Sequence, residues 1–263
     1  MVEKGTLSWK GFYKNERSLR ADVISTRIDE WLGREDPEVL KVVNRGGVLS
    51  FPHTALDGSL DPVIRIVKAI KDCEMERIIA MAVVHYGNTG PSDEFSLDLL
   101  EYIVEEMRSK GDSDIPEITY LYPPEDKSPF KDIDDRINRA KAEANKLKDL
   151  NDGSTAFVIT GDLSHYGEVY NRTTENPDFR KQMDEWIEEC MDLIYHKGDY
   201  VEYLDMARIS GNDQYILALM MKELLGENLE YKFFQKSFTD YSEILGESPP
   251  VYVASYFYGL WKK

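Results

Sequence analysis

Histidines stand at the ends of three predicted strands, and they are the residues in this 263-residue chain whose type and spacing most suggest chemistry. The chain has four histidines; His53 and His85 follow directly on predicted strands, and His165 lies in the connection after a third. Parallel strands bring their carboxyl ends to one edge of a sheet, where these imidazoles would converge on one crevice. Imidazoles bind metals and move protons near neutral pH. The alternative is that each histidine caps its own strand end independently.

The heptapeptide 161–167, Gly-Asp-Leu-Ser-His-Tyr-Gly, places a carboxylate three residues before an imidazole. The apolar run 155–160 predicts a buried strand that ends at Gly161, so both side chains fall where ligands of open α/β sheets bind. Asp162 could fix the tautomer of His165, which could then transfer a proton, and Tyr166 or Tyr86 could hydrogen-bond a bound ligand. The plainer interpretation is a capping aspartate and a half-buried histidine that hold the loop together.

A metal ion would explain the gathering of histidines. Two neutral imidazoles and one oxygen ligand suit non-haem Fe(II), with open positions for O₂ and a substrate. Zn²⁺ accepts the same kinds of ligand. Carboxylates for the third position are available at Asp57, Asp162 and Asp213. His165 could be a further ligand or an acid/base group beside the metal.

Strand and helix patterns alternate along the chain, which predicts a layered α/β fold. No linker rich in Pro, Gly or Ser divides the sequence, so we expect one domain over residues 1–263. Predicted strands cover 48–51, 77–84, 118–122 and 155–160, and two late ones, 231–238 and 251–258, are expected at the sheet edge or antiparallel. Predicted helices cover 18–32, a segment capped by Asp61 with Pro62 at its first position, a segment from Ser92 or Ser96 to 107, 130–147, 177–195, 200–206 and 216–224.

Composition narrows the class of partner. The formal net charge is −17, with acidic residues spread along the chain, which disfavours nucleic acid and anionic membranes as partners. The two cysteines, Cys73 and Cys190, form neither a disulfide framework nor a CxxC site. The sequence has no secretory h-region and no apolar run of about 18 residues, so we expect a cytoplasmic protein.

Several short segments resemble, in the same order, the Memo family, which shares its fold with the class III extradiol (LigB-like) dioxygenases. The closest match is 161–167, which resembles the family's "DxSHYG" motif. The other matches are Gly11-Phe12-Tyr13 to "AGxFY", Phe51-Pro52-His53 with Gly58 to "PHAGYxYSG", the strand ending in His85 to "GPxH", Ile209-Ser210-Gly211 to "xCG", and 251–258 to the closing strand.

The resemblance implies a single-domain, three-layer α/β/α fold around a central mixed, largely parallel sheet. It implies that His53 and His85 are metal ligands and that Asp162 and His165 line the same pocket. The third ligand is Glu in the dioxygenases and usually Cys in Memo-type proteins. Ser210 stands at the Cys position here.

Asp213 is the nearest carboxylate to Ser210, and it would complete a two-His-one-carboxylate triad. A site without thiolate favours Fe(II) over copper. The segment 54–57, Thr-Ala-Leu-Asp, departs from the family's Ala-Gly-Tyr, which bears on the substrate more than on the metal.

These residues together predict a non-haem metal oxygenase or dioxygenase, with Fe(II) as cofactor and O₂ as co-substrate, acting on a small molecule. One alternative is a Memo-type metal- or peptide-binding protein without turnover. Another is a zinc-dependent hydrolase. The substrate and any homo-oligomer are left open by the sequence.

Overall fold

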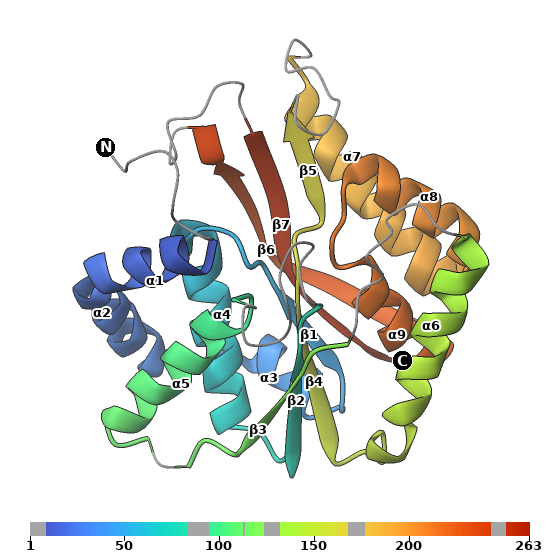
Figure 1. Cartoon of the computed structure of the whole chain (residues 1–263). Helices are drawn as coiled ribbons and strands as arrows, with labels where there is room; N and C mark the ends of the chain where they lie inside the picture. Colours follow the sequence, from blue (N-terminus) through green and yellow to red (C-terminus); the bar gives the residue numbers. More distant parts are fainter. Residues whose placement is uncertain (1–8, 84–94, 113, 124–131, 168–176, 243–250) are drawn as a thin grey trace.

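The computed structural model builds one mixed β-sheet with helices on both faces (Figure 1). It describes residues 9–83, 95–112, 114–123, 132–167, 177–242 and 251–263. The strands are β1 Val48–Phe51, β2 Arg77–Met81, β3 Ile118–Leu121, β4 Thr155–Thr160, β5 Ser164–Gly167, β6 Leu229–Asp240 and β7 Val251–Lys262. The helices are α1 Trp9–Leu19, α2 Ala21–Leu32, α3 Pro37–Val43, α4 Leu56–Lys71, α5 Asp98–Ser109, α6 Ile133–Lys146, the 3₁₀ helix η2 Lys148–Leu150, α7 Phe179–Met191, the π-helix η4 Asp192–Lys197, α8 Tyr200–Ser210 and α9 Tyr215–Leu225.

The sheet has the strand order β3-β2-β4-β1-β7-β5, and β6 also pairs with β7. The pairs among β1 to β4 are parallel, whereas β7 is antiparallel to β1, β5 and β6. Among the described strands, β7 alone therefore runs against the rest. The expected mixed, largely parallel sheet is confirmed.

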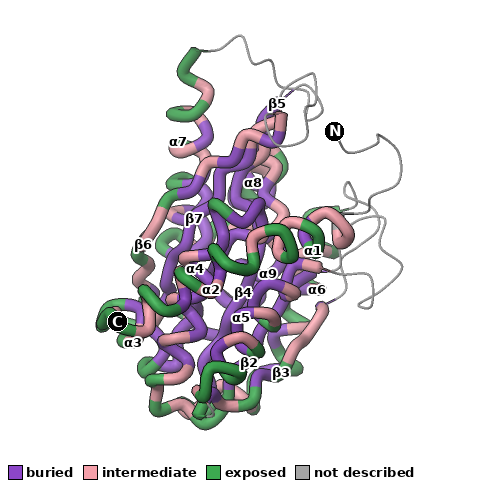
Figure 2. The backbone as a smooth tube through the Cα atoms, turned by 90° about the vertical axis from the view of Figure 1, so that its left-hand side faces the viewer, coloured by how far each residue is buried: buried purple, intermediate pink, exposed green. Residues whose placement is uncertain are grey.

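Successive residues of the central strands face opposite helix layers. In β4, Phe157 and Ile159 pack with α6 to α9, and Ala156 and Val158 pack with α2 to α5. This two-residue alternation on a strand buried on both faces gives the expected three layers. Figure 1 shows the two helix layers on either side of the sheet, and Figure 2 shows the buried strands inside them.

The carboxyl ends of β1 and β4 lie next to each other. Their last residues, Phe51 and Thr160, are partners in the parallel ladder. The N–H of Gly161 still donates to the Phe51 carbonyl at 3.3 Å, so the segments after β1 and β4 separate only beyond this point. His53 and Asp162 each follow two residues after the paired positions, and they leave the sheet side by side.

β2 also ends at this edge, because its last residue, Met81, is the partner of Ile159 in β4. The edge is therefore the one that the sequence predicts for the histidines. His85, the second predicted ligand, lies outside the described residues, as does Tyr86.

The prediction for the start of α4 is wrong: the helix begins at Leu56, and Pro62 lies inside it. Proline has no N–H, so it cannot bond the carbonyl of Gly58, four residues earlier. The hydroxyl of Ser237 in β6 donates to that carbonyl instead, at 3.0 Å. Asp61, the predicted cap, pairs with Arg27 of α2. β6 thus compensates for a proline inside α4 that local sequence rules would place at the start of a helix.

The prediction for residues 161–167 is also wrong in part, because 164–167 form a strand and not a loop. β5 is antiparallel to β7, with His165 opposite Val253. Asp162 lies in the short link between β4 and β5. The partner strand is far away in the sequence, so no local pattern could reveal the pairing.

The helices differ from prediction mainly at their ends. The predicted helix 18–32 and the aromatic turn before it form two helices, α1 and α2, and α8 continues to Ser210. α3 lies in a segment for which the sequence predicts nothing. No helix in the described ranges combines the length and apolar character that crossing a membrane requires.

Candidate metal site

His53, Asp162 and Asp213 converge at the carboxyl edge of β1 and β4. Nε2 of His53 lies 3.1 Å from Oδ2 of Asp213 and 3.6 Å from Oδ2 of Asp162. One ligand atom from each residue lies within 4.8 Å of the other two. His53 comes from the β1–α4 link, Asp162 from the β4–β5 link, and Asp213 from the α8–α9 link. Three separate connections thus supply one cluster.

The distances from Nε2 of His53 to the two carboxylates suit a metal ion. Donors about 2.1 Å from an ion lie about 3.0 Å apart at right angles and about 3.4 Å apart at tetrahedral angles. The two distances measured from His53 Nε2, 3.1 and 3.6 Å, are close to those values. The donor set is one imidazole and two carboxylates, which Fe(II), Mn²⁺ and Zn²⁺ all accept. The residues present therefore fit a divalent metal.

Reciprocal hydrogen bonds hold the two aspartates together. The N–H of Asp162 donates to Oδ1 of Asp213 at 2.6 Å, and the N–H of Asp213 donates to the Asp162 carbonyl at 3.1 Å. Gly161 makes this approach possible, because a Cβ there would lie 2.5 Å from Cβ of Gln214. The glycine that ends β4 thus lets the α8–α9 link press against the strand end.

His165 stands beside the cluster with a defined tautomer. Its Nδ1 lies 2.6 Å from the carbonyl of Gly211, and a carbonyl can only accept, so Nδ1 carries the hydrogen. Nε2 of the neutral ring is then unprotonated, and it lies 4.0 Å from Oδ2 of both Asp162 and Asp213. The predicted partner for tautomer selection was Asp162, and the structure assigns that role to Gly211.

Gly211 can accept this bond because of its position. It caps the C-terminal end of α8 with φ +70°, in the left-handed region that favours glycine. A Cβ at Gly211 would also lie 3.2 Å from Cβ of His165. The turn that ends α8 therefore sits directly against β5.

Asp162 is the most buried of the four polar groups, with its side chain 4% exposed. Burial raises the pKa of the Asp162 carboxyl; the nearby His53 opposes this rise, and the charge of Asp213 adds to it. The hydroxyl of Ser255 in β7 donates to Oδ1 of Asp162. Oδ2, the other oxygen, is the one that faces His53. A buried carboxylate beside a second, partly exposed carboxylate is a costly arrangement that a bound cation would relieve.

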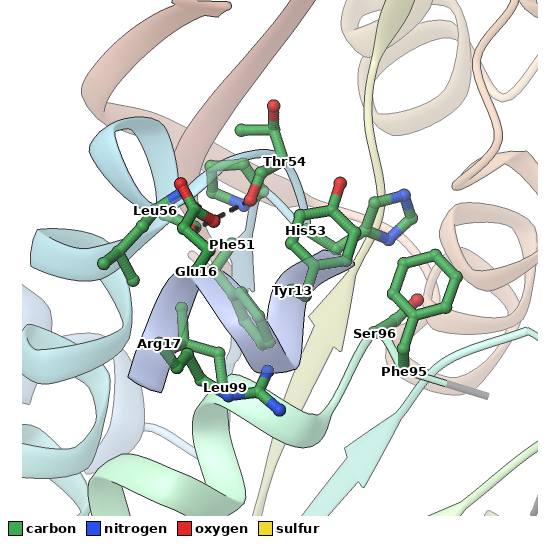
Figure 3. Close-up of a pocket in the computed structure, with 12 residues that line it drawn as sticks. Tyr13, Glu16, Arg17, Phe51, His53, Thr54, Leu56, Phe95, Ser96 and Leu99 are labelled. Carbon is green, nitrogen blue, oxygen red and sulfur yellow. Dashed lines mark hydrogen bonds between the residues drawn. The ribbon is translucent and has the colours of Figure 1, made fainter. Parts of the chain in front are cut away.

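A small cavity opens beside His53 (Figure 3). It measures about 20 Å³, room for about one water-sized group. The ring of Phe95 stacks on Tyr13 with centroids 5.1 Å apart and lies 6.2 Å from the His53 ring. The hydroxyl of Tyr13 lies 2.7 Å from that of Tyr241, which is 3.1 Å from Oγ1 of Thr54. Phe95 and Tyr13 therefore form an aromatic wall of the cavity, and the hydroxyl-bearing residues Tyr13 and Thr54, which also line it, both bond to Tyr241.

Helix α1 is held against this cavity by Glu16. Both oxygens of its carboxylate lie 3.1 Å from the N–H of Leu56, the first residue of α4. Ala55 precedes Leu56 and has no polar side chain to cap the helix. Glu16 supplies that cap from a distant helix, and burial raises the pKa of its carboxyl.

The remaining sequence candidates lie elsewhere. Asp57 is exposed and pairs with Arg20 at 2.7 Å, so it is not the oxygen ligand. The hydroxyl of Ser210 donates to the Ala207 carbonyl within α8. The structure also does not bring Tyr166 to the cluster: its ring packs on Phe179 and Trp186 of α7, at centroid distances of 5.2 and 6.1 Å. Adjacent residues of a strand face opposite sides, so Tyr166 turns away as His165 turns in.

Sequence reasoning assigned Asp162 to His165 and missed how closely it approaches His53. The signal was available, because His53 and Asp162 stand at equal distances beyond two predicted parallel strands. Ser255 and the Tyr13–Tyr241 pair were missed, and nothing local marks them.

No model of a known protein family matches the chain, and no curated protein matches it significantly. The resemblance to the Memo family therefore stays a prediction that depends on short motifs.

Proposed function

We propose that this chain is a metal-dependent enzyme that acts on a small molecule, with the ion held by His53, Asp162 and Asp213. The observation that carries the proposal is the convergence of His53 Nε2 with Oδ2 of both aspartates, from three separate links, at a sheet edge where Asp162 is buried and His53 and Asp213 are partly exposed. Such edges are where open α/β sheets bind ligands. A second imidazole, that of His165, has its Nε2 4.0 Å from Oδ2 of Asp162, and clusters of ionisable groups of this kind are candidate functional sites.

Within that class we propose a non-haem Fe(II) oxygenase. The donors are nitrogen and oxygen, and the described cysteines lie elsewhere: Cys190 is buried in the core around α7, and Cys73 follows α4. This donor chemistry suits Fe(II) better than copper. When bound, Fe(II) would supply the capacity to activate O₂ beside a substrate.

The protein's own groups have separable roles in this proposal. Nε2 of His165 accepts a proton from the substrate, since Nδ1 keeps its hydrogen on Gly211. The aromatic wall of the cavity, formed by Tyr13 and Phe95, excludes water from the side of the site next to His53. Tyr13 and Tyr241 serve as hydrogen-bond donors, because burial raises the pKa of both phenols well above the usual value and keeps them protonated.

Substitution of Asp213 tests the metal site. In Asp213→Asn the amide oxygen can keep the bond from the Asp162 N–H, while the second position loses its charge. We expect at least about tenfold weaker binding of Fe(II), measured anaerobically by titration and by metal content. Asp57→Asn is the matched control, since Asp57 is exposed and pairs with Arg20, away from the cluster. Equal affinities for the two variants would contradict the proposal.

Oxygen consumption tests the reaction. The Fe(II)-loaded protein is incubated with candidate diols and other chelating small molecules, and O₂ uptake is compared with that of Asp213→Asn. Uptake by the wild type alone is expected. Turnover that persists under strict anaerobiosis would replace the oxygenase with a hydrolase. Tight metal binding without any turnover would leave a metal-binding protein.

A further inference from the structure

Gln214 follows Asp213 directly and is completely buried, with 0% of its surface exposed. Its side chain spans two strands. The amide N–H donates to Oγ of Ser50 in β1 at 2.7 Å, and the amide oxygen accepts from the Tyr258 hydroxyl of β7, also at 2.7 Å. Ser50 and Tyr258 are themselves partners across the β1–β7 ladder. One amide therefore bridges a cross-strand pair in the middle of the sheet.

The bridge is rigid for physical reasons. Ser50 and Tyr258 are also 0% exposed, so water cannot replace either bond. Burial raises the pKa of Tyr258 to about 12, which keeps its hydroxyl a donor at neutral pH. The N–H of Gln214 donates to Oδ1 of Asn212 at 2.8 Å, which closes a turn around Asp213. The position of Asp213 is thus restrained by the turn between Asn212 and Gln214 and by the bonds of the Gln214 side chain.

Each strand that is clamped also leads to the site. β1 continues into His53, and β7 carries Ser255, which donates to Asp162. Gln214 thereby ties the link that carries Asp213 to the two strands that position the other ligands. Its own Cβ fills the space that Gly161 leaves open at the end of β4.

We propose that Gln214 is the positioning residue of the metal site: its amide, held between Ser50 and Tyr258, fixes Oδ2 of Asp213 opposite Nε2 of His53. The inference rests on the proposed metal site. It assigns to the buried, neutral side chain of Gln214 a role in metal affinity. If Gln214 served only the stability of the core, its substitution would leave the metal affinity unchanged.

Titration with Co²⁺ alone, followed by its visible absorption bands, tests the inference because the bands report both affinity and coordination geometry. We expect Gln214→Leu to weaken Co²⁺ binding at least about tenfold and to alter the bands, as loss of an outer partner of a ligand does. Tyr258→Phe removes one half of the bridge and is expected to weaken binding about threefold. It also supplies the test if Gln214→Leu fails to fold.

Tyr195→Phe is the matched control. Tyr195 is also buried, and its hydroxyl lies 3.3 Å from that of Tyr258, to which it bonds instead of to the Gln214 amide. Tyr195→Phe removes a buried hydroxyl one hydrogen bond further from the site. We therefore expect the Co²⁺ affinity to stay within about twofold of the wild-type value while the free energy of unfolding falls. A loss of affinity equal to that of Tyr258→Phe would overturn the inference.

A double-variant cycle separates positioning from general destabilisation. Once Asp213→Asn has removed the ligand, adding Gln214→Leu should weaken Co²⁺ binding by less than twofold further. Wild-type affinity in Gln214→Leu, or full additivity with Asp213→Asn, would overturn the inference and leave the metal site intact. Failure of the wild type itself to bind Co²⁺ would instead overturn the proposed function.

Discussion

The hydrogen bond from His165 to Gly211 separates two roles for an imidazole near a metal. Its Nε2 lies 4.0 Å from Oδ2 of both aspartates, further than Nε2 of His53. We therefore predict that His165→Ala retains Fe(II) and loses turnover by about 10²- to 10⁴-fold, the range typical of a lost acid/base group. Metal content and turnover of one preparation check this. His196→Ala, at an exposed histidine paired with Asp192, is the control.

Loss of the metal from His165→Ala would contradict this role and make His165 a ligand. A ligating histidine commonly donates its other ring N–H to a backbone carbonyl, as His165 does, so the metal measurement decides between the two roles.

We expect the Asp162 carboxyl to lower the stability of the metal-free protein. Burial raises its folded-state pKa above the unfolded value, so the folded carboxyl holds its proton more tightly. The protein therefore becomes less stable as the pH rises from the pKa of Asp162 in the unfolded state to its pKa in the folded state. Above the folded-state pKa the loss of stability is complete. We predict that Asp162→Asn in chelator melts a few degrees higher than the wild type at pH 7. The difference should shrink towards about pH 4, where the unfolded carboxyl takes up its proton.

Adding Mn²⁺ should reverse that order, because the wild type alone retains the full ligand set and gains stability from binding. Thermal unfolding followed by circular dichroism provides both comparisons. A lower melting temperature for Asp162→Asn in chelator at pH 7 would count against the burial argument.

At the scale of single residues, the sequence identified part of the site. His53, Asp162, Asp213 and His165 were all named from strand ends and motif order, and the structure brings them together. Their division into ligands and acid/base groups could not be read from the sequence, because it depends on which atoms face each other. The Gly211 carbonyl and Ser255 show the difficulty, since any residue type has such a carbonyl and serines are common.

At the scale of elements, the proline inside α4 gives a test of how strand and helix depend on each other. Ser237→Ala would leave the Gly58 carbonyl without the donor that replaces the missing N–H of Pro62. We predict a loss of about 1–3 kcal/mol in the free energy of unfolding, the cost of a buried acceptor left unsatisfied. Denaturant unfolding of the two proteins measures it.

A second substitution supplies the control. Pro62→Ala restores an N–H that can reach Gly58, so Ser237→Ala should cost much less in the Pro62→Ala background. Equal costs in both backgrounds would show that Ser237 acts through something other than this carbonyl.

Element boundaries followed the sequence where the pattern is local and failed where it is not. β4 and the apolar stripe of α5 were predicted closely, because each is a continuous apolar signal. β5 was missed since its pairing partner, β7, lies far along the chain. The start of α4 was missed because Glu16 and Ser237, both remote in sequence, satisfy the groups that proline and alanine leave open.

At the scale of the whole molecule, the net charge of −17 should concentrate cations around the site. Salt screens such a field, and the Debye length is about 10 Å at 0.1 M and about 3 Å at 1 M. We predict that the affinity for Co²⁺ falls about three- to tenfold between 0.05 and 0.5 M NaCl. The free metal concentration is fixed with a chelator calibrated at each salt concentration. An affinity independent of salt would mean that only the local ligands matter.

β7 pairs with β1, the first described strand along the sequence, and with β5 and β6. Gly259 opposes Leu49, so the ladder joins residues separated by most of the chain. During synthesis on a ribosome, β1 and the link bearing His53 emerge long before Tyr258 and Ser255. Ser255 of β7 donates to Asp162, one of the three proposed ligands, so the proposed metal site cannot be complete until β7 has been synthesised.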